Sequence, residues 1–154
     1  MNDTDQYYMR LALEQAALAA GLGEVPVGAL IVQNDRVIAA GYNRREIDKN
    51  ALSHAEHIAI DQACRTLGGW RLPQCTLYVT LEPCLMCAGA ILNARIERVV
   101  FGAYDEKGGA FGSKIDANTA GLNHTVRVEG GVCEVECRAL LTRFFKDLRL
   151  MKKL

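Results

Sequence analysis

The chain has 154 residues, half of them hydrophobic, and its 18 basic and 18 acidic side chains cancel at neutral pH. That length predicts one domain, spanning residues 1–154, with a hydrophobic core of its own. A net charge of zero argues against broad nonspecific nucleic-acid binding, although it leaves room for a local basic patch.

The N-terminal residues do not follow the secretory pattern, because Asp3, Asp5 and Glu14 interrupt the first twenty positions and no basic start precedes an apolar run. No stretch of membrane-spanning length is free of charged residues. Six cysteines in such a chain fit a reducing compartment better than three disulfides. We therefore expect a cytoplasmic protein with no membrane association.

Hydrophobic periodicity predicts alternating helices and strands. In chain order they are a helix over 3–20, strands over 27–32 and 37–42, a helix over 53–67, a strand over 76–79, a helix over 83–94, strands over 98–103 and 125–128, and a closing helix over 132–148. Strands that alternate with helices after a hairpin predict a mixed sheet covered on both faces. The expected fold is therefore α/β, a three-layer α/β/α sandwich around a five-stranded mixed sheet.

Local signals set several of these boundaries. Asp3 is the expected N-cap of the first helix, and Asn34-Asp35 is a tight-turn pair between the first two strands. Pro83 fits the first position of the third helix, where its missing N–H costs nothing. The segment 104–124 is long for a loop in a compact domain, so it is expected to be functional or to contain a short helix.

The stretch from Thr80 to Cys87 carries the strongest chemical signal, because a buried strand there turns directly into a helix. Cys84 and Cys87 are three apart in the expected first turn, where the helix dipole and the free N–H groups favour thiolates. Two thiolates are half of a tetrahedral zinc site, and His54 would be a third ligand that leaves one position for water. Glu56 could then reach that water without binding the metal.

Each part of this pattern has an ordinary explanation when it stands alone. Ser53-x-x-Glu56 fits a helix capping box, a lone His54 would be a structural histidine, and Cys84-x-x-Cys87 could be a redox pair. Together they match the H-x-E…P-C-x-x-C pattern of zinc-dependent nucleobase deaminases. The remaining cysteines are expected to be structural: Cys64, Cys75, Cys133 and Cys137.

Over roughly residues 24–145 the sequence closely resembles the bacterial tRNA-specific adenosine deaminases, within the cytidine deaminase-like superfamily. The resemblance extends well beyond the zinc pattern. The matching blocks are Glu24-Val25-Pro26-Val27-Gly28-Ala29, Asn43-Arg44, His54-Ala55-Glu56, 76–84, Cys87-Ala88-Gly89-Ala90, Phe101-Gly102-Ala103, Gly109-Ala110, Leu122-Asn123-His124 and Phe144-Phe145.

This resemblance implies an RNA-editing hydrolase that converts adenosine to inosine at the wobble position of tRNA and releases ammonia. It implies a homodimer that binds the anticodon loop, with one zinc ion per subunit held by His54, Cys84 and Cys87. Glu56 would be the catalytic proton shuttle. Substrate contacts are implied for four further residues: Val27 and Asn43 at the flipped base, and Asp105 and Phe145 at neighbouring nucleotides.

Two other functions stay open at this point. A deaminase of free nucleosides or free bases would share the zinc site and differ in its pocket and in the glycine-rich segment 105–113. A zinc-stabilised binding module would instead close the fourth metal position with a protein ligand. No fourth Cys or His has convincing spacing in the sequence, which counts against the binding module.

Overall fold

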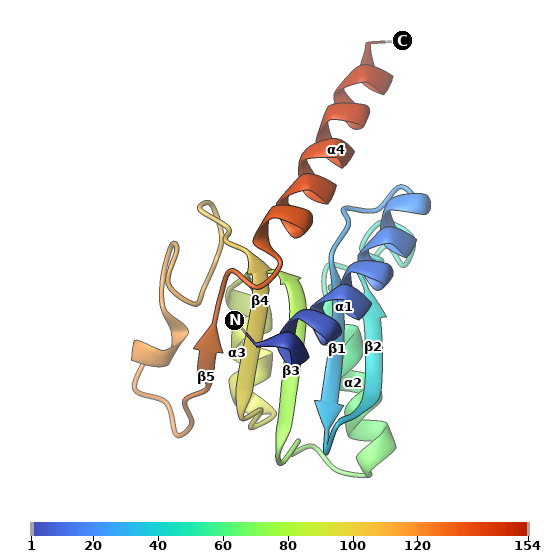
Figure 1. Cartoon of the computed structure of the whole chain (residues 1–154). Coiled ribbons are helices and arrows are strands. Elements are labelled where there is room, and N and C mark those ends of the chain that lie inside the picture. Colours follow the sequence, from blue (N-terminus) through green and yellow to red (C-terminus); the bar gives the residue numbers. More distant parts are fainter. Residues whose placement is uncertain (1, 154) are drawn as a thin grey trace.

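The computed structural model describes residues 2–153, so residues 1 and 154 of the expected domain lie outside the described part (Figure 1). Its elements are α1 (Asp3–Gly21), β1 (Gly28–Gln33), β2 (Arg36–Tyr42), α2 (Ala55–Leu67), β3 (Cys75–Leu81), α3 (Leu85–Asn93), β4 (Arg98–Ala103), the 3-10 helix η1 (Ala117–Thr119), β5 (Arg127–Glu129) and α4 (Glu134–Lys152). The strand order is β2-β1-β3-β4-β5. β1 is antiparallel to β2 and β3, whereas β3, β4 and β5 are parallel, so the predicted five-stranded mixed sheet is confirmed.

Two separate hydrophobic cores cover the two faces of this sheet, because neighbouring residues of a strand point to opposite sides. In β1, Ala29 and Ile31 pack in the core that contains α2 and α3, whereas Leu30 and Val32 pack in the core that contains α1. The first turns of α4 join α1 on that second face through Leu141 and its buried neighbours. These are the three layers that the sequence predicted.

Two connections follow their local sequence signals. The turn pair Asn34-Asp35 joins β1 to β2 with φ values of 52° and 61°, the left-handed conformation that a two-residue hairpin turn requires. The long segment after β4 contains η1, so the expected short helix is present there.

The first helix begins differently from the prediction. Asn2, not Asp3, is the N-cap of α1, and its side-chain oxygen accepts a hydrogen bond of 2.7 Å from the backbone N–H of Asp5. The carboxylate of Asp5 is buried and accepts hydrogen bonds from the hydroxyl of Tyr78 and the guanidinium of Arg98. These bonds hold the first turn of α1 against the sheet, and Asp3 is then already helical.

The closing helix α4 packs on the sheet over only part of its length. α4 contacts β4, β3 and α1 near its start and then projects from the body of the molecule (Figure 1). Of the residues that the periodicity predicts for its apolar face, only Leu141 is buried and Phe145 is 42% exposed, whereas the others are half-buried: Leu140, Phe144 and Leu148. The apolar periodicity therefore continues along the part of the helix that projects from the sheet. No helix within residues 2–153 combines the length and the apolar character needed to cross a bilayer.

Candidate active site

A small cavity lies at the end of the sheet where β3 ends. The start of β1 is at this same end because β1 runs antiparallel to β3. The cavity has a volume of about 170 Å³, below the roughly 300–1,000 Å³ of pockets that enclose a whole drug-sized ligand. Its lining residues are Val25, Val27, Asn43, Arg45, His54, Ala55, Glu56, Leu81, Glu82, Cys84 and Asp105. A cavity of this size suits the insertion of one part of a larger substrate.

Two helices begin at this cavity, and both begin later than predicted. His54 is the N-cap of α2 and Cys84 is the N-cap of α3, each with an extended backbone at ψ values of 155° and 175°. Ser53 and Glu56 therefore do not form the capping box, and Pro83 lies before the helix. Neither N-cap residue makes a side-chain capping hydrogen bond.

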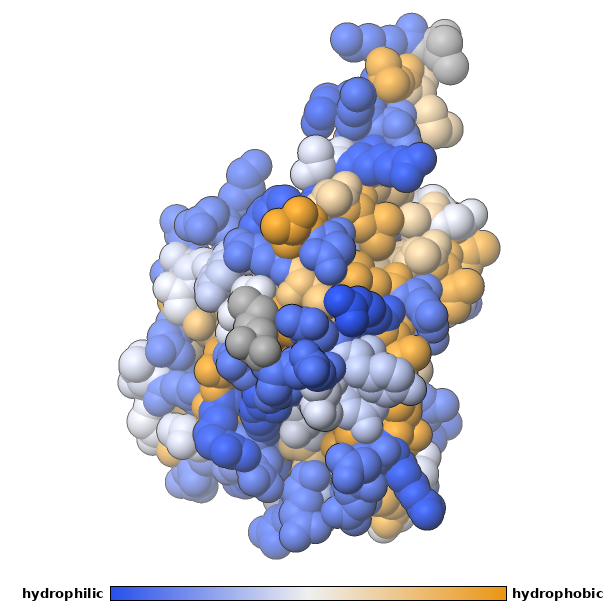
Figure 2. All heavy atoms as spheres, viewed as in Figure 1, coloured by the Kyte–Doolittle hydropathy of each residue, from blue (hydrophilic) through white to orange (hydrophobic). Residues whose placement is uncertain are grey.

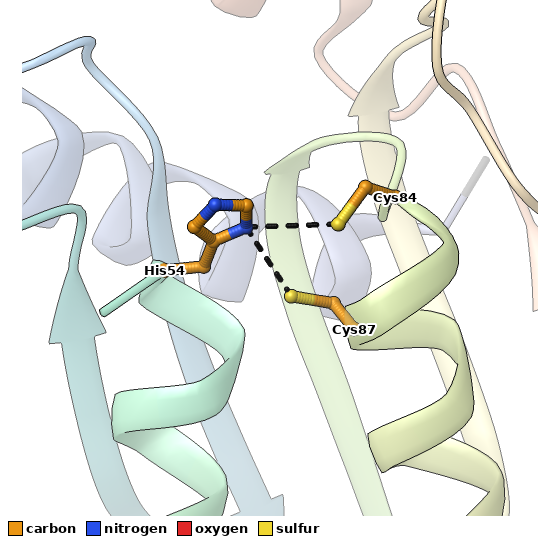
Figure 3. A group of neighbouring side chains, drawn as sticks. All are labelled: His54, Cys84 and Cys87. Atoms are coloured by element: carbon orange, nitrogen blue, oxygen red, sulfur yellow. Dashed lines mark hydrogen bonds between the residues drawn. The ribbon is translucent and has the colours of Figure 1, made fainter. Parts of the chain in front are cut away.

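The His54, Cys84 and Cys87 side chains point toward one another between the two helices (Figure 3). Nδ1 of His54 lies 3.6 Å from Sγ of Cys84 and 3.5 Å from Sγ of Cys87. Zn–S and Zn–N bonds of ordinary length at a tetrahedral angle place nitrogen and sulfur about 3.6 Å apart. This donor set therefore fits a tetrahedral metal site without rearrangement.

Three protein donors form this group, and their ligand atoms all lie within 4.8 Å of one another. Within the part of the chain that the structure describes, no fourth His, Cys, Asp or Glu joins them. An open fourth position is the mark of a catalytic site, whereas a structural site is closed by protein. The geometry thus disfavours the zinc-stabilised binding module.

The electrostatics of the site suit both a metal and a proton transfer. A hydrogen bond from Cys87, with a further contribution from His54, lowers the pKa of Cys84 to about 3, so one thiolate is available at neutral pH. Glu56 lines the cavity from the first turn of α2 and is only 4% exposed. Burial raises the pKa of Glu56 to about 7, which suits a group that must both accept and release a proton.

Asn43 is buried at the cavity wall, and the backbone fixes its orientation. Its side-chain N–H donates to the carbonyl of Val25 at 3.2 Å, and its side-chain oxygen accepts from the N–H of Arg45 at 3.1 Å. An asparagine amide has two N–H groups and two lone pairs, so one donor and one acceptor remain for a ligand.

The other predicted substrate residues fall in two places. Val27 and Asp105 line the cavity with Asn43. Phe145 does not line it and lies exposed on the projecting helix α4, in edge-to-face contact with Phe144. The structure thus brings together six of the predicted residues, Val27, Asn43, His54, Glu56, Cys84 and Asp105, around the cavity, with Cys87 buried behind it.

Two buried carboxylates near the cavity had no assigned role in the sequence analysis. Glu24 is 1% exposed and accepts hydrogen bonds from the backbone N–H groups of Glu46 and Ile47. Glu82 is 2% exposed and accepts from the loop that follows β4. Burial alone would raise the pKa of Glu82, but hydrogen bonds led by the one from Ser113 lower it below the usual value.

The only sequence signal for these carboxylates was their position in the blocks that resemble the family. Arg45, which also lines the cavity, stood without any signal in a charged loop. The partners of Glu24 and Glu82 are backbone N–H groups of loops distant in sequence, which no local pattern can identify.

Comparison with known proteins agrees with this geometry. The family model of the MafB19-like deaminases matches residues 2–149. A tRNA-specific adenosine deaminase of Bacillus subtilis is 48% identical over 97% of this chain and 93% of its own. A structure from a study of A-to-I editing by tRNA:A34 deaminases is 43% identical, with a TM-score of 0.83 over 88% of this chain and 99% of its own. The Bacillus subtilis guanine deaminase structure is 31% identical, with a TM-score of 0.62 over 80% of this chain and 88% of its own.

The three-layer sandwich and the donor set at its helix starts place the chain among enzymes of the cytidine deaminase-like fold, and it is a deaminase. The 48% identity to a tRNA-specific adenosine deaminase, over 97% of this chain, narrows the class of enzyme further. The chain belongs to the family of tRNA-specific adenosine deaminases.

Proposed function

We propose that this protein hydrolyses adenosine to inosine at the wobble position of tRNA and releases ammonia, with one zinc ion per subunit as cofactor. The observation that carries the proposal is the open donor set of His54, Cys84 and Cys87 beside the buried carboxyl of Glu56. The names of the relatives supply the substrate class, because they describe tRNA adenosine deaminases and editing at the wobble position.

In this mechanism the metal, when bound, supplies Lewis acidity and an activated water for attack on C6 of adenine. Glu56 accepts the proton of the attacking water and delivers it to N1 of the base. The same carboxylate then takes the remaining proton from the hydroxyl now on C6 and passes it to the amino group, which leaves as ammonia. A pKa near 7 lets Glu56 take up and release the proton at neutral pH without a large energetic penalty in either direction.

The cavity admits a base that has left its stack. Asn43 has one donor and one acceptor free for the polar edge of adenine. Val27 contributes an apolar wall. An anticodon loop presents unpaired bases that can be splayed out, whereas a base inside a duplex would first have to be unpaired. The small cavity and a flipped wobble nucleotide therefore fit together.

The projecting part of α4 suits an RNA partner. The start of α4 lies beside the loop that follows β4, because the Arg138 guanidinium donates a hydrogen bond to the carbonyl of Tyr104. The next residue of that loop, Asp105, lines the cavity. Figure 2 shows that the surface of the projecting part of α4 is mostly hydrophilic. Between residues 138 and 153 only Asp147 is acidic, and six side chains are basic: Arg138, Arg143, Lys146, Arg149, Lys152 and Lys153. In a chain of zero net charge, this concentrates positive charge where phosphates would approach.

Phe145 offers an exposed ring among these basic residues, and we expect it to stack on a nucleotide next to the target. Phe145→Ala should weaken binding of an anticodon stem-loop by about 1–3 kcal/mol, the usual contribution of a stacked base. Fluorescence anisotropy with a labelled stem-loop measures this loss. Val135→Ala is the matched control, because Val135 is 78% exposed on the same helix. Equal affinities for Phe145→Ala and the control would remove Phe145 from the RNA contact.

We extend the proposal to a single deaminase domain, a cytoplasmic location and a homodimer. The outer face of α3 supports the dimer, because Leu85 is 63% exposed there and a Cβ at Gly89 would meet open space. Such an apolar surface beside the metal ligands could be buried by a second copy. Sedimentation equilibrium of the zinc-loaded protein tests this point, and a monomer at micromolar concentration would contradict it.

The reaction itself is tested by offering several substrates to the zinc-loaded protein: a tRNA with adenosine at the first anticodon position, free adenosine, cytidine and guanine. We expect inosine at the wobble nucleotide alone, measured by mass analysis of the digested RNA. Turnover of free guanine with the tRNA unchanged would instead move the protein to the branch of its guanine deaminase relative. That outcome would keep the metal site and discard the RNA substrate.

A further inference from the structure

The carboxylate of Glu82 is the point where the loop after β4 is held. Its Oε1 accepts from the N–H of Asp105 at 3.0 Å and from the hydroxyl of Ser113. Its Oε2 accepts from the N–H groups of Phe111 and Ser113, at 3.0 and 3.1 Å. One buried side chain therefore satisfies three backbone amides and a hydroxyl that span nine residues of loop 105–113.

Glu82 lies two residues before Cys84, in the turn between β3 and α3. Its own N–H donates to the carbonyl of Ala103 at 2.8 Å, at the end of β4. The next residue, Pro83, accepts a hydrogen bond from Ala110 of the loop, also at 2.8 Å. Glu82 thus fixes the loop against the segment that holds one of the metal donors, and both Glu82 and Asp105 line the cavity.

Gly109, on the loop, supports this interpretation because its backbone lies against the Glu82 carboxylate. A Cβ built at Gly109 would fall directly on the Glu82 carboxyl group. The backbone of the loop therefore approaches the carboxylate as closely as it can, and only glycine leaves room for the four hydrogen bonds.

We propose that Glu82 is a positioning residue for the deamination, which holds loop 105–113 so that Asp105 forms the cavity wall next to the metal-ligand turn. This inference rests on the proposed function, because it assigns the loop to recognition of the RNA around the target base. Glu82 acts through the loop and does not touch the reacting atoms. Its carboxylate form is required, since all four of its partners are donors.

Glu24, which precedes the cavity-lining residue Val25, provides an internal comparison. Its two oxygens accept from the N–H groups of Glu46 and Ile47, at 3.1 and 2.7 Å, in the loop that follows Asn43. Each buried carboxylate thus holds one loop, and the two sets of amides do not overlap. A general loss of stability would loosen both loops, whereas loss of one carboxylate should loosen only its own loop.

Glu82→Gln is the sharpest test, because it preserves shape and removes one acceptor. With the amide oxygen placed toward Phe111 and Ser113, the new NH2 group can donate to the Ser113 hydroxyl but faces the N–H of Asp105. The reverse orientation sets the NH2 group against two backbone N–H groups and is worse. We therefore expect the Asp105 amide to lose its partner first.

Hydrogen exchange followed by NMR on the zinc-loaded protein measures this directly. In Glu82→Gln the amide of Asp105 should exchange at least about tenfold faster, a change of about 1.4 kcal/mol in local opening. The amides of Glu46 and Ile47 should keep the wild-type rate. Glu24→Gln should produce the opposite pattern. Equal acceleration at both loops, or none at Asp105, would overturn the positioning role.

The kinetic counterpart separates positioning from simple folding. Misplacing the loop should lower kcat/KM for an anticodon stem-loop by up to about 100-fold, mainly through KM, while zinc stays at one per chain. Gly109→Ala should reproduce both the exchange pattern and the kinetic loss while residue 82 stays a glutamate, because its Cβ would push the loop away from the carboxylate. Glu97→Gln controls for removal of a charge, because Glu97 is exposed at the opposite end of β4. Faster exchange with unchanged kinetics would also refute the proposal.

The exchange pattern does not depend on the reaction. If the wild-type protein leaves tRNA unchanged, the proposed function fails, yet the loop assignment can still be measured. If the wild type is active and Glu82→Gln behaves like it in both assays, the positioning role alone fails.

Discussion

Glu56→Gln should lower kcat for wobble deamination by about 10⁴-fold, the upper end of what general acid–base catalysis contributes. The amide keeps the size of the carboxyl and cannot accept a proton, so the transfers to N1 and to the leaving amino group are lost together. Glu56 is 4% exposed, and the buried site offers little bulk water to replace it. Single-turnover formation of inosine, followed by mass analysis, measures the effect.

Zinc content makes this experiment specific for the proton shuttle. Glu56 lies outside the donor group, so the variant should bind one zinc per chain as the wild type does. Asp61→Asn removes a carboxylate from the exposed side of the same helix, where Asp61 pairs with Arg65, and should leave activity unchanged. A Glu56→Gln protein that loses zinc, or that still turns over, would show that the role assigned to Glu56 is wrong.

The fold could be predicted from the sequence because its signals are local and strong. The run of apolar residues in β1 and the hairpin pair Asn34-Asp35 each identify their element without tertiary information. The extent of α4 packing could not be predicted, because periodicity marks an apolar stripe and not what covers it. Phe144 and Phe145 continue the stripe, yet Phe145 is exposed.

The site was predictable to the degree that its residues form spaced motifs. His54, Cys84 and Cys87 meet as their pattern indicated, although both helices begin one or two residues later than their local signals suggested. The reason is that His54 and Cys84 are N-caps whose side chains turn toward the donor group and not toward the helix backbone. Because these two side chains serve the donor group and not the helix backbone, the usual capping signals predicted the wrong helix starts.

Glu24 and Glu82 show the limit of such reasoning. Each is an isolated acidic residue in sequence, and an acidic residue is exposed far more often than buried. What buries them is a set of backbone N–H groups from loops more than twenty residues away. Only the folded chain brings those amides together, so neither role could be derived from spacing.

Cys87→Ser should abolish stoichiometric zinc binding and, with it, measurable deamination. A serine hydroxyl is nearly isosteric with the thiol but is not deprotonated near neutral pH, so the site loses an anionic ligand. Only two donors, His54 and Cys84, remain, whereas a catalytic zinc site needs three protein ligands. Zinc per chain after dialysis against a weak chelator, measured by mass spectrometry, should fall well below one.

This loss should also appear in stability, because the metal would connect the first turns of α2 and α3. A ligand that binds only the folded state stabilises it by about 2.7 kcal/mol at a hundredfold excess over its Kd. Chelation should therefore lower the Tm of the wild type and leave that of Cys87→Ser unchanged. Cys64→Ser is the matched control, since Cys64 lies outside the donor group and the variant should respond to chelation as the wild type does. A Cys87→Ser protein that still gains stability from zinc would mean that the metal is held by other residues.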